Sequence, residues 1–267
     1  MIALSRLLAD RRRDAFGWAI GTIAGVAAVV GLWPSVEGNQ DIEQIVEDLP
    51  PSLRALLGSQ ADIPLSSAPG YLQARLFSTL LPILLIVYAI SLGARAIGAA
   101  EEDGTLQLPM TGPITRRRIA LERIAGSTVL LVAVGAVGWA TAAGLGALVG
   151  LPDVGAARMA LATLAVAGLA LLHLAIAAAV GAATGRRGPA VTTASAVAVG
   201  GFVLHGLAAS AEALRPARAL SPWWWLLDRN LLVQDPTFLA LGLPPILATI
   251  ALLLGLATFE RRDLRFP

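Results

Sequence analysis

The sequence predicts an all-α integral membrane protein that crosses the bilayer six times, as one transmembrane domain over residues 1–267. Two observations predict this fold class. Charged residues make up 14% of the chain, while 56% of the residues are hydrophobic and the mean hydropathy is +0.72; soluble domains average about 25% charged residues. In addition, six apolar runs reach the ~20 residues that a helix needs to cross the hydrocarbon core. A surface with so few charges is suited to lipid.

The beginning of the chain predicts a surface helix followed by the first span. Residues 1–14 combine apolar and basic positions, which indicates an interfacial helix with its arginines toward lipid headgroups. The first span covers residues 16–33, and Trp18 and Trp33 lie near its ends, where aromatic belts occur. A signal peptide has a similar order of charge and hydropathy, but no small-residue cleavage site follows this run. We therefore expect the span to be retained.

Five further spans follow, separated by polar segments. Pro82 lies inside the second span and predicts a kink that neighbouring helices can tolerate. The acidic segment 34–75 contains two stretches typical of short amphipathic helices, DIEQIVEDL and PSLRALLG, and segment 212–236 contains three consecutive tryptophans. The five predicted spans are residues 76–99, 119–151, 156–183, 190–211 and 238–259.

The distribution of arginine predicts the orientation of these spans. Fourteen of the twenty arginines lie in the N-terminal segment, in or beside segment 101–118, in the turn after the fourth span and in the C-terminal tail. The other loops hold six. By the positive-inside rule, the first group is cytoplasmic, together with both termini. Segments 34–75 and 212–236 are then extracytoplasmic loops.

Several classes of function are excluded by composition. The chain has no cysteine, hence no disulfide, thiolate metal site or cysteine nucleophile. All its basic side chains are arginines, and a P-loop ATPase site requires a lysine. The net charge of +2 gives no basis for nucleic-acid binding. His173 and His205 each stand alone in an apolar run, where a histidine is either a proton relay or a structural residue. We expect no metal site and no enzyme active site.

Segment 101–118, with the sequence EEDGTLQLPMTGPITRRR, is unusually polar for this chain and admits three interpretations. It is a solvated loop whose arginines set the topology, a site for anionic lipid headgroups, or a docking element for a soluble partner. Its three leading acids argue against a purely electrostatic lipid anchor. For docking, Gly104 permits a sharp turn, Asp103 or Thr105 caps a short helix, and Thr115 caps the helix that returns to the membrane. Such a stiff knob can pass a push from a partner to two spans.

In this order of features the segment resembles the permeases of ATP-binding-cassette (ABC) transporters, specifically the type-2, export-class permeases. The likeness extends to LPPSLRALLG in the first outer loop, GYLQARLF before the second span and FERRDL near the C-terminal end, so it covers nearly the whole chain. Residues 107–112 depart from the longer leucine run that such permeases often carry.

The resemblance implies that segment 101–118 is a cytoplasmic coupling helix that inserts into a separate ATPase subunit. ATP and magnesium would bind that subunit, and this chain would hold no cofactor. Two ATPase copies and a second permease chain, identical or homologous, would complete a transporter in the inner membrane of a prokaryote. The coupling residues implied are Glu101, Glu102, Asp103, Gly104, Thr105, Leu106, Leu108, Pro109, Thr115 and Arg116. The membrane-interface anchors are Arg11, Arg12, Arg13, Arg117 and Arg118.

The sequence gives less information about the substrate than about the fold. Because the spans contain almost no charge, we expect export of a lipophilic or amphipathic substrate such as a drug, an antibiotic or a lipid. The alternative is a membrane scaffold or sensor subunit whose cytoplasmic loop binds a regulatory protein. Candidate polar residues of a substrate path are Ser91, Thr128, Thr141, His173, Ser195 and His205.

Overall fold

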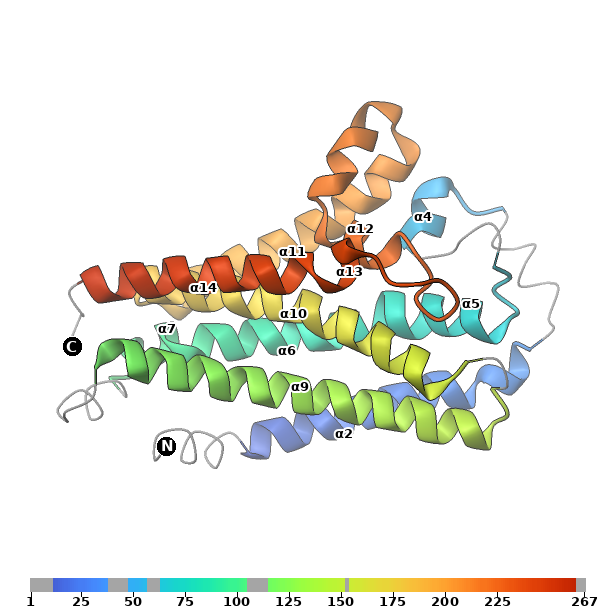
Figure 1. Ribbon diagram of the computed structural model, residues 1–267, viewed down its shortest axis with the longest axis horizontal. Coiled ribbons are helices and arrows are strands. Elements are labelled where there is room, and N and C mark those ends of the chain that lie inside the picture. Colours follow the sequence, from blue (N-terminus) through green and yellow to red (C-terminus); the bar gives the residue numbers. More distant parts are fainter. Residues whose placement is uncertain (1–11, 38–47, 57–62, 105–114, 152–153, 263–267) are drawn as a thin grey trace.

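The computed structural model describes residues 12–37, 48–56, 63–104, 115–151 and 154–262, and the regular structure within these ranges is helical. Six helical stretches are long and apolar enough to cross a membrane, which confirms the predicted fold class. Figure 1 shows them lying side by side along one long axis. The main helix of each stretch is α2 (Arg12–Gly31), α6 (Leu81–Ala96), α9 (Arg116–Leu148), α10 (Ala156–Thr184), α11 (Arg187–Ser210) and α14 (Leu243–Arg261).

The second span is longer than predicted, because helical structure begins well before residue 76. It starts with α5 (Ala68–Leu72), whose N-cap Ser67 accepts a hydrogen bond from the backbone NH of Gly70. A π-helical stretch, η2 (Gln73–Leu80), then leads into α6. Proline lacks an NH and clashes with the carbonyl one turn earlier, so a wider turn before Pro82 relieves that conflict. The predicted irregularity at Pro82 therefore takes the form of a π-helix.

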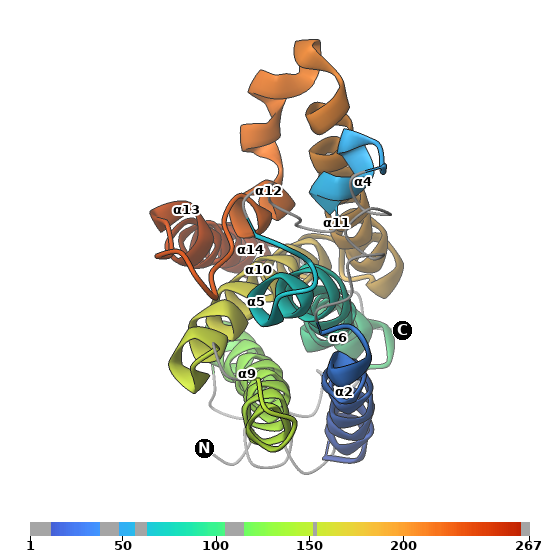
Figure 2. The same cartoon turned by 90° about the vertical axis from the view of Figure 1, so that its right-hand side faces the viewer.

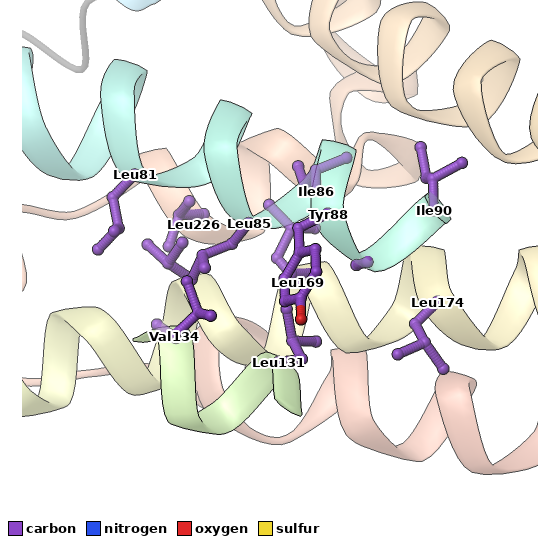
Figure 3. Packing of buried hydrophobic residues seen from close by; sticks show 14 of the residues in the cluster. Leu81, Leu85, Ile86, Tyr88, Ile90, Leu131, Val134, Leu169, Leu174 and Leu226 are labelled. Atoms are coloured by element: carbon purple, nitrogen blue, oxygen red, sulfur yellow. The ribbon is translucent and has the colours of Figure 1, made fainter. Parts of the chain in front are cut away.

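Helix α10 lies at the centre of the bundle and packs against α6, α9, α11 and α14. Figure 2 shows α6 and α10 between α2 and α9 on one side and α11 and α14 on the other. Figure 3 shows leucine, isoleucine and valine side chains of α6, α9 and α10 meeting there beside Tyr88, together with Leu226. Tyr88 is 2% exposed. In lipid, where apolar burial between helices gives little driving force, such contacts depend on close approach and dispersion.

Gly93 of α6 allows the closest approach to α10. A Cβ atom built on Gly93 would stand 2.3 Å from the carbonyl oxygen of Leu174 and 2.9 Å from the Cβ of Ala177. Both neighbours belong to the central helix, so the two backbones are in direct contact here. The small residues of the sequence thus have a packing role at this site.

In the described residues between the spans, several polar stretches form short helices. Predicted helix PSLRALLG appears as α4 (Pro51–Leu56), which packs against α11, whereas most of DIEQIVEDL lies outside the described residues. The first span ends in a 3-10 turn, η1 (Trp33–Ser35). Segment 212–236, predicted as a loop, contains a second 3-10 helix, η3 (Glu212–Leu220), and the short helix α12 (Pro222–Leu227).

Tryptophans hold this last segment against the bundle. Trp223 is 4% exposed, and its indole NH donates a 2.8 Å hydrogen bond to the carbonyl of Ala198 in α11. The indole NH of Trp225 donates one of 2.8 Å to the carbonyl of Ala219. Trp224 differs, because it lies under the guanidinium of Arg218, 5.0 Å from the ring centroid. The short helix α13 (Phe238–Leu241) then leads into α14.

Candidate functional site

The described residues that flank segment 105–114 come from two elements at one end of the bundle (Figure 1). Glu101 and Glu102 close the short helix α7 (Gly98–Glu102), and Asp103 is its C-cap. Gly104 has a φ of +66°, the left-handed backbone that glycine adopts without strain, so the expected sharp turn is present. The predicted coupling residues Thr105, Leu106, Leu108 and Pro109 lie outside the described residues.

On the far side of that segment, Thr115 is the N-cap of α9, as its sequence context predicts. Its hydroxyl oxygen accepts a hydrogen bond of 3.4 Å from the backbone NH of Arg118. The side chains of Arg116, Arg117 and Arg118 are exposed in the first turn. Arg118 also pairs with Glu122 of the same helix at 3.1 Å.

The other predicted interface anchors lie at the start of α2. Arg12 and Arg13 are exposed in its first turn, while residues 1–11 of the predicted interfacial helix 1–14, including Arg11, lie outside the described residues. Next to them, Asp14 of α2 forms an ion pair with Arg95 of α6, in which Oδ2 of Asp14 lies 2.6 Å from Nη1 of Arg95. This pair is a contact that the sequence did not predict.

A cavity of about 480 Å³ opens between α2 and α6 beside that ion pair. Its polar end is formed by Arg13, Asp14 and Arg95, and its apolar wall includes Trp18 and Tyr88, whose ring centroids are 5.1 Å apart. A charged end and an aromatic wall suit a molecule with a polar head and an apolar body.

The residues predicted for a substrate path are spread over four helices. Ser91 of α6 lines the cavity between α2 and α6. The hydroxyls of Thr128 and Thr141 donate to the carbonyls of Ile124 and Val137 in their own helix α9, at 3.0 and 2.8 Å. Hydroxyls satisfied by their own helix in this way have little need of a ligand.

The two histidines occupy buried positions in different helices. His173 of α10 is 0% exposed, and its Nδ1 lies 2.8 Å from the carbonyl oxygen of Leu169 in the same helix. His205 of α11 is 7% exposed, and Ser195 of that helix is half-buried. In the part of the chain that the structure describes, no three His, Asp or Glu side chains gather in a metal-binding group.

A long-range ion pair at the same end of the bundle was not foreseen. Glu101 is 5% exposed, and its carboxylate pairs with Arg262, which follows α14. The sequence signal was limited to the acidic end of the second span and the FERRDL stretch, which carry no information on their mutual distance. Glu101 therefore points into the protein, while Glu102 beside it is exposed.

These features define a polytopic helical membrane protein whose polar helix ends gather at one end of the bundle. The model of the ABC-2 family transporter protein matches residues 8–264, nearly the whole chain. The chain belongs to this family, which confirms the resemblance seen in the sequence. It is therefore the transmembrane permease type of subunit, not itself an enzyme, and the family implies association with an ABC ATPase. A search of curated proteins found no match.

Proposed function

We propose that this chain exports a lipophilic or amphipathic substrate, driven by ATP hydrolysis on a separate ATPase that docks at segment 101–118. Two such chains, or this chain and a homologue, would assemble with two ATPase subunits in the inner membrane of a prokaryote, with both termini cytoplasmic. ATP and magnesium would reside on the ATPase. The family match over residues 8–264, together with six spans, is the observation that carries the proposal.

Rigid flanks support docking at this segment. On one side, α7 ends at Glu102 and the chain turns at Gly104; on the other, Thr115 caps α9. A push on a segment held between two helix ends moves those helices, whereas a push on a slack loop is lost in its own bending. ATP hydrolysis supplies the energy, and the ATPase shifts the permease toward the conformation that it binds more tightly.

The docking claim is tested by a matched pair of proline variants. Gly104 and Gly150 have φ values of +66° and +68°, one before α9 and one after it, and proline requires about −65°. Gly104→Pro should abolish co-purification of the ATPase, and Leu106→Asp should do the same. Gly150→Pro distorts a similar turn at the opposite end of α9 and should retain the ATPase. Equal binding by all three variants would refute docking at this segment.

The cavity between α2 and α6 supports an amphipathic substrate. It contains two arginines and one carboxylate at its polar end, and Gly17 and Gly21 leave its α2 side open. A Cβ atom built on either glycine would meet nothing within 4 Å. A lipid-like molecule would place its headgroup by the charges and its apolar part against Trp18 and Tyr88.

A further inference from the structure

The ion pair of Glu101 and Arg262 is enclosed to a degree that surface pairs are not. The two side chains are 5% and 20% exposed, and an Arg262 Nη2 donates directly to a Glu101 carboxylate oxygen. In the exposed pair of Arg215 with Glu212, by contrast, both side chains are more than half exposed. Exposed ion pairs contribute little to stability, whereas removing one partner of a buried pair leaves an uncompensated charge and strongly destabilises the protein. The pair is therefore a persistent contact.

Arg262 also joins the ends of two further helices. Its Nε donates to the carbonyl of Ala182 in the last turn of α10, at 3.3 Å. Its own carbonyl accepts a 3.3 Å hydrogen bond from Nη1 of Arg116, the first residue of α9. A guanidinium at the C-terminal end of a helix is favourable, since the last carbonyls of α10 lack partners within the helix. One residue after α14 thus contacts α7, α9 and α10.

The backbone of α10 is shaped to leave room for this ion pair. Gly185 ends α10 with a φ of +68°. A Cβ atom built there would stand 2.6 Å from Oε1 of Glu101 and 2.7 Å from Nη1 of Arg262. An alanine at this position would therefore be strained by the left-handed backbone and would displace the ends of the Glu101 and Arg262 side chains.

The helix ends on both sides of segment 105–114 therefore contact the residue that follows α14. Glu101 precedes the segment by a few residues, Arg116 follows it after Thr115, and both contact Arg262. A second, more exposed pair lies nearby, with Arg117 Nε 4.0 Å from Glu260 Oε1.

We propose that Glu101, Gly185 and Arg262 form a C-terminal clamp that makes the helix ends on the two sides of segment 105–114, in α7 and α9, move as one body with the adjoining ends of α10 and α14. This inference rests on the proposed docking of an ATPase at that segment. Without the clamp, a push on α7 and α9 would reach α10 and α14 only through the packing of these helices against one another. With it, the same push also displaces the central helix α10 and the last span. Glu101 and Arg262 are positioning residues in this scheme.

The ABC ATPase that co-purifies with the wild-type chain is reconstituted together with the chain in proteoliposomes. The test measures the rate of ATP hydrolysis per assembled complex. We expect the permease to change the ATPase rate, and Arg262→Ala to reduce that change by about fivefold or more while the ATPase still co-purifies. The neighbouring Arg261 is exposed, and Arg261→Ala should behave as wild type. A purely structural role would instead lower the amount of complex and leave the rate per complex unaltered.

Two further variants keep the test decisive if Arg262→Ala is poorly produced. Gly185→Ala leaves both charges in the chain but displaces them, and should cause the same loss. The chain has no cysteine, so Glu101→Cys with Arg262→Cys places two unique thiols at the clamp. A short bis-methanethiosulfonate cross-linker should restore most of the lost rate in this double variant, and a reductant should remove it again.

Each remaining outcome counts against a stated claim. Unchanged rates in Arg262→Ala and Gly185→Ala, with wild-type stimulation intact, would overturn the clamp and leave the proposed function standing. Cross-linking that blocks hydrolysis would show that the contact must open, which contradicts a rigid clamp. A wild-type chain that neither binds nor affects an ABC ATPase would refute the proposed function and the clamp together.

Discussion

The contact of Gly93 with α10 predicts a large effect from one added methyl group. In Gly93→Ala the new Cβ would stand 2.3 Å from the carbonyl oxygen of Leu174, a backbone atom that cannot rotate away. It would also stand 2.9 Å from the Cβ of Ala177. The helices α6 and α10 must therefore separate, which weakens the contacts around them.

The magnitude follows from the nature of the clash. Overpacking a well-packed site costs about 1–3 kcal/mol. Because the obstacle is backbone, we expect the upper part of this range for Gly93→Ala, about 2–3 kcal/mol. Alanine in a helix regains about 0.5–1 kcal/mol over glycine. The net loss of about 2 kcal/mol corresponds to roughly thirtyfold in the unfolding equilibrium.

A matched control separates the clash from helix propensity. Gly144 lies inside α9, and a Cβ atom there would meet nothing within 4 Å. Gly144→Ala should therefore be neutral or stabilise by up to about 1 kcal/mol. The free energies of unfolding of both variants are measured by SDS titration in mixed micelles, followed by circular dichroism. If Gly93→Ala unfolded at the same SDS fraction as Gly144→Ala, the inferred backbone contact of α6 with α10 would be refuted.

Three other predictions concern the cap, the tryptophan segment and the cavity. Thr115→Ala should destabilise the start of α9 by about 1 kcal/mol, seen as faster hydrogen exchange at the Arg118 amide, and Thr115→Ser should show no such increase. Trp223→Phe removes the bond to α11 and should lower stability by about 1 kcal/mol in the same SDS assay; a larger loss for Trp224→Phe would contradict this assignment. Gly21→Leu fills the cavity between α2 and α6, and should slow transport of a fluorescent phosphatidylethanolamine analogue without changing the SDS midpoint; unaltered transport would exclude this cavity.

The six spans were predictable from the sequence because each depends on local properties of the chain. Long apolar runs leave few alternatives to helix in lipid, since every backbone polar group needs an internal partner. Local caps were predictable for the same reason: Thr115 needs only its own hydroxyl and an amide three residues later. Family membership also followed from a local motif, EEDGTLQLPMTGPITRRR, placed between two spans.

The segment 212–236 shows where local reasoning failed. Its polar composition predicts a loop. Trp223 is nevertheless buried, and its indole NH donates a hydrogen bond to the carbonyl of Ala198 in a different helix. The second span began earlier than expected for a similar reason. Gln73 precedes the apolar run that begins at residue 76, but inside the bundle its Nε2 donates a 3.3 Å hydrogen bond to the hydroxyl of Ser78. Burial among neighbours overrides the composition of a short segment.

The sequence alone therefore determined the fold class, the number of spans, the helix cap at Thr115 and the family. The tertiary structure decided which distant residues meet, including Glu101 with Arg262, Asp14 with Arg95 and Gly93 with Leu174. The physical reason is that hydropathy and capping act over a few residues. Contacts between helices depend on how six helices rotate and tilt against each other, and small residues in lipid permit many such arrangements.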